Sequence, residues 1–328
     1  MKKSLTGLVV LILSLGLFFL LAEGALRFLS SHFLHVFDVE MWRYARAVKV
    51  ESHDPGVIEE HRPNADEQLM GVRVRTDGHG FRLPDPATQA KRGPADRMVI
   101  AVGDSVTFGW GAGEAETFPA QLENLLAAGC PRHTTVYNAG IGNCNTSMEL
   151  ARYKLHVRPL GLHPDWVILG YSYNDGEPDA VPSTNPFLWH SALLALTSAR
   201  LQRRSGVLSD YKQYYQGLYE EGRPGWENTK RALREFGALL QADGIPASII
   251  LMPELHEPKN FGPFAGFFAK VAQVSREAGF EVIDPSGDFP AGSGRDFWVS
   301  YEDAHPNVRG QAIYAKALLR SRYACPNK

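Results

Sequence analysis

A short apolar run that ends on a glycine constrains the fold of this 328-residue chain more than any other feature. Met98–Val102 is apolar throughout, and Gly103-Asp104-Ser105 follows it directly. Such a run, closed by a turn signal, is typical of a strand buried on both faces of a parallel sheet. In open α/β sheets, ligands bind at the carboxyl ends of the strands, so Ser105 is a candidate centre of a functional site.

A histidine beside two carboxylates lies near the other end of the chain. The segment 302–307 reads Glu-Asp-Ala-His-Pro-Asn. A serine hydroxyl is a weak nucleophile unless a base accepts its proton. His305 is therefore the candidate partner of Ser105.

Four more strand patterns follow the first and alternate with helical patterns. These predicted strands are Thr135–Asn138, Trp166–Tyr171, Ala247–Met252 and Phe280–Asp284. The helical patterns cover about 119–128, 147–157, 226–242 and 264–279. Five strands that alternate with helices predict an α/β fold with a flavodoxin-like, doubly wound, parallel five-stranded sheet.

These motifs, with two Asn-containing loops between them, resemble those of the SGNH hydrolases, also called the GDSL family of ester hydrolases and acyl-transferring enzymes. The resemblance follows the motif order over about residues 97–320, and the chain is most similar to membrane-anchored members. It implies the SGNH hydrolase fold and serine-dependent ester chemistry with no metal and no organic cofactor.

The resemblance also implies an oxyanion hole made by the Ser105 backbone N–H, a loop N–H and the Asn174 side-chain amide. The family usually has a glycine at the loop position, which is Asn143 here, and Gly142 is the alternative donor. The family pattern Gly-x-Asn-Asp matches residues 172–175 except that Ser172 replaces the glycine. Preorganised donors of this kind contribute about 3–4 kcal/mol each in other hydrolases.

The family's catalytic triad maps onto Ser105 as nucleophile and His305 as general base and then general acid. The carboxylate that orients the histidine is Asp303, by similarity to membrane-anchored members that read Asp-Ala-His-Pro-Asn. Glu302 is the alternative, because many members place the acid three residues before the histidine.

Residues 1–22 are predicted to form a membrane helix. Lys2 and Lys3 precede an uncharged stretch, Ser4–Ala22, whose nineteen residues span about 28 Å as a helix. Signal peptides usually have apolar regions of about 7–15 residues, so we expect an uncleaved signal anchor, with a cleaved signal peptide as the alternative. The lysines would stay in the cytoplasm, which makes the rest of the chain extracytoplasmic, either periplasmic or at the cell surface.

The remaining chain divides into a membrane-proximal segment, 23–97, and a hydrolase domain, 98–328, with an insertion at about 176–225. The insertion has tyrosines at helical spacing, which fit packing or stacking on a glycan. They are Tyr211, Tyr214, Tyr215 and Tyr219.

Composition excludes several classes of protein. The formal net charge of -2 argues against a nucleic-acid partner. Three cysteines are too few for a disulfide framework. One bridge, Cys130–Cys325, can join the ends of the first and last core helices if the domain is extracytoplasmic, and the sequence leaves it open. Cys144 is expected to be a free thiol, and no metal site is expected.

We therefore predict an extracytoplasmic serine esterase or O-acyl transferase that acts on a small-molecule or glycan ester, with O-acetyl esters of a glycan as the favoured substrate. Its expected membrane contact is the N-terminal helix. The alternatives are a catalytically silent, membrane-anchored scaffold of an envelope or polysaccharide-export assembly, and a lipase or lysophospholipase.

Overall fold

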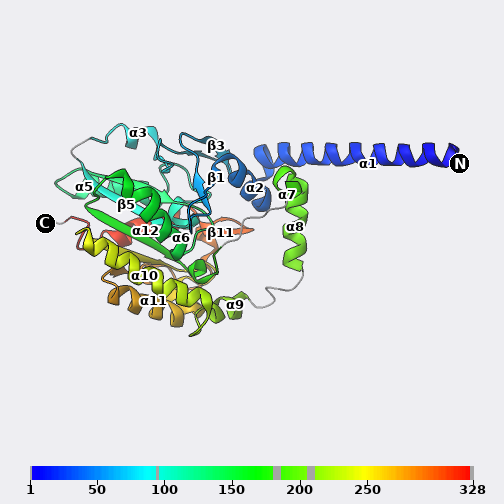
Figure 1. Ribbon diagram of the computed structural model, residues 1–328. Helices are drawn as coiled ribbons and strands as arrows, with labels where there is room; N and C mark the ends of the chain where they lie inside the picture. The colour runs from blue at the N-terminus through cyan, green and yellow to red at the C-terminus, as the bar shows by residue number, and fades with distance from the viewer. Residues whose placement is uncertain (1, 94–95, 180–185, 205–210, 326–328) are drawn as a thin grey trace.

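The computed structural model describes residues 2–93, 96–179, 186–204 and 211–325. A parallel five-stranded sheet with strand order β6-β5-β7-β8-β9 forms its centre (Figure 1). The strands are β5 (Arg97–Gly103), β6 (Thr134–Gly140), β7 (Trp166–Ser172), β8 (Ala247–Met252) and β9 (Glu281–Ile283). This order confirms the predicted flavodoxin-like sheet.

Helices cover both faces of the sheet, which explains why β7 and β8 are buried at every position. On β5, Val99 and Ala101 pack into one apolar cluster with α5 (Phe118–Gly129) and α12 (Val308–Leu318). Ile100 and Val102 point to the opposite cluster, because successive side chains of a strand alternate between faces. That second cluster includes side chains from three more helices, namely α6 (Thr146–Arg152), α10 (Pro224–Ala242) and α11 (Ala265–Glu277).

Short elements connect this core and shape the edge where the strands end. They are α4 (Ser105–Phe108), η2 (Tyr153–Val157), η3 (Arg158–Leu160), η4 (Tyr173–Gly176), η5 (Lys259–Phe264), η6 (Ser286–Asp288) and η7 (Gly294–Phe297). An antiparallel hairpin of β10 (Trp298–Ser300) and β11 (Asp303–Pro306) precedes α12.

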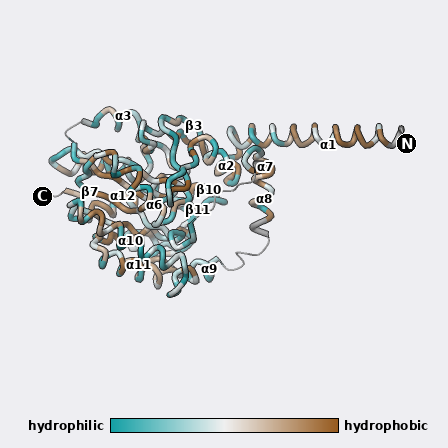
Figure 2. Tube along the Cα trace, viewed as in Figure 1, coloured by the Kyte–Doolittle hydropathy of each residue, from teal (hydrophilic) through white to brown (hydrophobic). Residues whose placement is uncertain are grey.

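The N-terminal helix α1 (Lys2–Leu29) projects from the domain that contains the sheet, and most of its length is hydrophobic (Figures 1 and 2). The stretch Leu5–Leu34, which includes the π-helical turn η1 (Ser30–Leu34), is long and apolar enough to cross a membrane. The helix continues past the predicted boundary at residue 22, because no proline follows Ala22 within it and the side chains of Leu26 and Phe28 extend the apolar pattern.

The membrane-proximal segment packs along the domain that contains the sheet. Its elements are α2 (Phe37–Ala47), β1 (Lys49–Glu51), β2 (Glu59–His61), β3 (Asp66–Leu69), β4 (Val72–Arg75) and α3 (Pro86–Gln89). β1 pairs with β2 and β3 pairs with β4, both antiparallel.

The predicted insertion contains α7 (Pro186–His190), α8 (Ala192–Arg204) and α9 (Tyr211–Leu218). α8 contacts α1 and α2, and Figure 1 shows it at the end of the domain from which α1 projects. Residues 180–185 and 205–210 of the insertion lie outside the described residues. The same holds for residue 1 of the predicted membrane helix, residues 94–95 of the membrane-proximal segment and residues 326–328 of the hydrolase domain.

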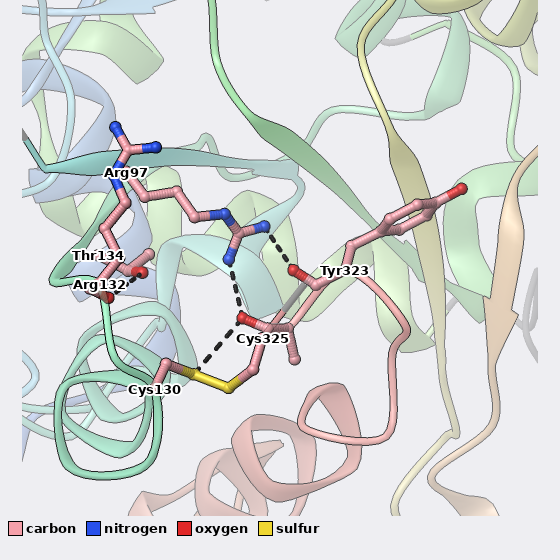
Figure 3. Close-up of a disulfide and its surroundings, with 7 residues drawn as sticks. Arg97, Cys130, Arg132, Thr134, Tyr323 and Cys325 are labelled. Carbon is pink, nitrogen blue, oxygen red and sulfur yellow. Dashed lines mark hydrogen bonds between the residues drawn. A yellow bond between two sulfur atoms is a disulfide. The ribbon is translucent and has the colours of Figure 1, made fainter. Parts of the chain in front are cut away.

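Cys130 and Cys325 form a disulfide that joins the end of α5 to the chain after α12 (Figure 3). Their Cα atoms are 5.5 Å apart, within the normal range for a bridge. The Arg97 guanidinium donates to the backbone carbonyls of Tyr323 and Ala324 beside it. Cys144 is a buried free thiol.

Candidate active site

Ser105 lies at the carboxyl end of β5, at the start of α4. The Asp104 carboxylate caps α4 by accepting a 2.8 Å hydrogen bond from the Val106 N–H. A Cβ at Gly140 would lie 2.3 Å from the Phe108 nitrogen, so α4 can approach β6 this closely only over a glycine. Local backbone chemistry and close packing together fix the position of the serine.

The hairpin before α12 brings His305 to Ser105 from 200 residues away. His305 Nε2 lies 2.9 Å from Ser105 Oγ, and His305 Nδ1 lies 2.6 Å from Asp303 Oδ1. The Asp303 side chain is almost fully buried. Glu302 points away, with 59% of its side chain exposed and its carboxylate 3.6 Å from Arg200. The geometry thus places Asp303, and not Glu302, against the histidine.

Trp110 completes the environment of this carboxylate, and the sequence reasoning missed it. Its indole Nε1 donates a 2.9 Å hydrogen bond to Asp303 Oδ2. Asp303 Oδ1 meanwhile accepts bonds from the ring and backbone N–H of His305. Trp110 follows Ser105 by five positions, but its partner Asp303 lies 193 positions further along the chain, on the hairpin before α12. No local pattern therefore connects the two residues.

Burial and charge act in opposite directions on the pKa values of this pair. Burial alone would lower the pKa of His305, but the hydrogen bond and charge of Asp303, with the charge of Asp104, raise it above its ordinary value. Burial would raise the pKa of Asp303, but the charge and hydrogen bonds of His305 and the Trp110 bond lower it. An ionised Asp303 therefore faces an imidazole that readily accepts a proton.

The three predicted oxyanion donors, Ser105, Asn143 and Asn174, all line one cavity. Asn143 has φ 64°, a left-handed conformation that Asn tolerates better than most residues. The alternative donor is engaged elsewhere, because the Gly142 N–H bonds to Tyr44 Oη at 3.0 Å. The geometry favours position 143 over position 142 as the loop donor.

Residues of the membrane-proximal segment hold the loops around the site. Lys49 Nζ donates to the Gly142 carbonyl at 2.7 Å. Arg82 is buried and donates to the carbonyls of Phe108, Gly109 and Ala112 in the chain after the serine. Burial lowers the pKa of Arg82 to about 10, so the guanidinium is still charged at neutral pH. This segment is part of the site's scaffold.

The cavity has a volume of about 350 Å³ and combines polar and aromatic groups. Phe37 and Met41 of α2 form one wall, and the Phe37 ring stacks near His305 with centroids 6.3 Å apart. Tyr215 also lines the cavity and donates a 2.8 Å hydrogen bond to Glu177. Of the predicted tyrosine stripe, Tyr219 is buried in packing, and its ring stacks on a phenylalanine.

Three carboxyl groups lie buried beneath the site, on Asp104, Glu149 and Asp175. Burial raises the pKa of each, and the charges of its neighbours add to the effect for Glu149 and Asp175. Asp175 also accepts bonds from the Ser172 N–H and the Thr146 hydroxyl, both 3.3 Å long. It thereby anchors the turn that carries the candidate oxyanion amide.

Residues 101–313 match the GDSL-like lipase/acylhydrolase family, and no curated protein sequence matches the chain. Among solved structures, it is similar to LAE5, an alpha/beta hydrolase from the metagenome of Lake Arreo, Spain, with 18% identity, TM-score 0.46, and coverage of 72% of this chain and 99% of that one.

It is also similar to Axe2, an acetylxylan esterase from Geobacillus stearothermophilus, with 20% identity, TM-score 0.44, and coverage of 70% of this chain and 94% of that one. The match over residues 101–313 spans more than half of the sequence. On that ground the chain belongs to the GDSL-like lipase/acylhydrolase family, and it is a serine ester hydrolase of the SGNH/GDSL type.

Proposed function

We propose that this protein is a membrane-anchored, extracytoplasmic esterase that removes O-acetyl groups from a glycan through the triad Ser105, His305 and Asp303. The observation that carries the proposal is the continuous hydrogen-bonded chain from Ser105 Oγ through the imidazole to the buried carboxylate. In serine hydrolases this arrangement activates the hydroxyl for attack on a carbonyl carbon.

The reaction follows from these positions in two steps. Ser105 Oγ attacks the ester carbonyl while His305 Nε2 accepts its proton, and the oxyanion binds to the N–H groups of Ser105 and Asn143 and the amide of Asn174. The imidazolium then protonates the departing sugar oxygen, leaving an acyl-enzyme. Water, activated by the same histidine, attacks the acyl-enzyme and releases acetate. A sugar hydroxyl in place of water would complete an acyl transfer.

The lining of the cavity supports a hydroxyl-rich substrate. Glu177 and Glu254 contribute carboxyl groups that can accept hydrogen bonds from sugar hydroxyls, and the rings of Tyr173 and Tyr215 offer apolar faces. Several acidic groups around one cavity disfavour an anionic phospholipid headgroup. The sugar class is therefore favoured over a lipid.

Two features support the extracytoplasmic location. The apolar stretch Leu5–Leu34 follows Lys2 and Lys3, and the positive-inside rule keeps those lysines in the cytoplasm. The Cys130–Cys325 disulfide is typical of an oxidising compartment. Both support a location of the catalytic domain outside the cytoplasm.

The experiment is hydrolysis of p-nitrophenyl acetate and longer-chain p-nitrophenyl esters by the detergent-solubilised full-length protein, together with labelling by a fluorophosphonate probe. Ser105→Ala should abolish labelling and lower turnover by at least about 10⁴-fold. The control is Ser147→Ala, outside the cavity lining, which should change neither.

Each outcome separates one alternative. No labelling of the folded protein would contradict the triad and favour a catalytically silent scaffold. Labelling with negligible hydrolysis would indicate an acyl transferase, and a preference for long-chain esters would indicate a lipase. Release of acetate from an acetylated polysaccharide by the wild type alone would support the glycan substrate.

A further inference from the structure

The insertion exposes large apolar side chains in a small area. Phe187 and Trp189 on α7 and Leu194 and Leu201 on α8 are each between 42% and 72% exposed. Soluble proteins rarely expose this much apolar surface in one area unless it binds a partner.

The exposed residues of α8 form one face of the helix. At about 100° per residue, Leu194 and Leu201 project in nearly the same direction, about 180–200° from Ala192. Ala192 is fully buried. Arg200 forms ion pairs with Asp38 of α2 at 3.5 Å and with Glu302 of the catalytic domain at 3.6 Å. One face of α8 is therefore held by the protein while the apolar face is open.

The start of α8 is fixed to a defined position along α1, at Glu23. The Glu23 carboxylate accepts hydrogen bonds from the backbone N–H groups of Ala192 (2.8 Å) and Leu193 (2.9 Å) and so caps the N-terminus of α8. Arg27 adds a 2.8 Å bond to the His190 carbonyl. On α2, Trp42 donates to the Leu188 carbonyl at 3.1 Å.

This position on α1 coincides with the end of the uncharged run Ser4–Ala22. Glu23 is the first charged residue after the uncharged run Ser4–Ala22, so in a membrane-spanning α1 it lies at the outer boundary of the hydrocarbon core. α8 therefore starts at the membrane surface. Figure 1 shows α8 running across the direction of α1, which lays it along the plane of the membrane.

We propose that α7 and α8 form a membrane-contact surface that inserts Phe187, Trp189, Leu194 and Leu201 into the interfacial region of the bilayer crossed by α1. Aromatic residues favour this region, and amphipathic helices lie in it with their apolar face toward the acyl chains. The surface would orient the catalytic domain on the membrane through the Arg200 ion pairs. This inference rests on the proposed anchoring by α1.

The test uses full-length protein in vesicles of phosphatidylethanolamine and phosphatidylglycerol that contain spin-labelled lipid. An environment-sensitive fluorophore is attached to Thr197→Cys, on the open face of α8, in separate samples from Leu11→Cys on α1 and Arg234→Cys on α10. Under non-reducing conditions the native disulfide and the buried Cys144 leave the introduced thiol as the reactive one.

We expect lipid spin-labelled near the headgroup to quench position 197 several-fold more strongly than position 234, and lipid labelled deep in the acyl chain to quench position 11. Adding Leu194→Glu with Leu201→Glu should reduce quenching at 197 to the level at 234. Hydrolysis of p-nitrophenyl acetate should not change, because neither leucine lines the catalytic cavity.

The outcomes test the membrane-contact surface separately from membrane anchoring by α1. Quenching at 11 without quenching at 197 would overturn the membrane-contact surface and leave the anchor in place. No quenching at 11 would overturn both. An emission spectrum that indicates an apolar environment at position 197, with no quenching by lipid, would mean contact with a second copy of the chain. That result would also overturn the proposal. Quenching that persists in the double glutamate variant would exclude the apolar contact we describe.

Discussion

The hydroxyl of Tyr44 accepts a 3.0 Å hydrogen bond from the backbone N–H of Gly142. Tyr44 belongs to α2, which follows α1 and η1 in the chain, and Gly142 directly precedes the candidate oxyanion donor Asn143. The same hydroxyl lies 2.6 Å from His61 Nε2, so the contact is part of a buried network. The membrane-proximal segment thereby fixes a loop of the catalytic domain.

Tyr44→Phe should impair catalysis without changing the lining of the substrate cavity. The ring would still pack against Phe108 and Trp110, but the Gly142 N–H would lose its partner and the loop would relax. We expect kcat to fall by about 10- to 100-fold, with a smaller change in KM, because a displaced oxyanion donor weakens transition-state binding.

Unfolding measurements should show a loss of about 1–3 kcal/mol, the usual cost of an unsatisfied buried polar group. Tyr301→Phe is the matched control, since this side chain is 78% exposed. An unchanged kcat in Tyr44→Phe would show that the loop holds its position without the hydroxyl.

Asp303→Asn and Glu302→Gln should separate the two candidate acids. We expect Asp303→Asn to lower kcat by about 10³- to 10⁴-fold, because the amide neither stabilises the imidazolium nor fixes the catalytic tautomer. Glu302→Gln should stay close to wild type, since its carboxylate points to Arg200. Steady-state kinetics of both proteins on one soluble ester decide the matter, and the reverse ranking would reassign the triad acid.

The pH profile of Asp303→Asn should move in a defined direction. The neutral imidazole is the base, so activity falls as pH drops through the pKa of His305. Asp303 raises that pKa, and its removal should therefore shift the acid limb of kcat/KM to lower pH. A shift to higher pH would mean that another group controls the limb.

Trp110→Phe should shift the acid limb in the opposite direction. The phenyl ring keeps most of the packing but removes the N–H that donates to Asp303 Oδ2. The carboxylate then carries more negative charge toward the imidazole and has a higher pKa itself, so the acid limb should move to higher pH. A purely structural role would lower stability and leave the profile in place, which makes the profile the deciding measurement.

The disulfide should stabilise the domain without taking part in catalysis. Thiol titration of the unfolded chain should find one free thiol before reduction and three after it. Cys130→Ser with Cys325→Ser should lose about 2–4 kcal/mol of stability and keep wild-type kcat at a temperature where it is folded. Three titratable thiols in unreduced protein exported from the cytoplasm would contradict the bridge.

The sequence predicted the sheet well because the information is local. The central strands are short, mainly apolar runs, and the run Ala247–Met252 matches β8 at both ends. The Gly-Asp-Ser motif and the Asp-Ala-His sequence identified the candidate catalytic side chains, because these are short patterns of adjacent residues. The N-terminal helix was equally clear from its uncharged length.

The tertiary structure alone decided the contacts between segments that are distant along the chain. No local pattern pairs Tyr44 with Gly142, Trp110 with Asp303, or Glu23 with the start of α8. Each is a single buried or capping hydrogen bond, and its partner is chosen by how helices and loops pack after the sheet has formed. Periodicity and motifs therefore determined which residues face the core and the site, whereas packing determined which polar groups hold them there.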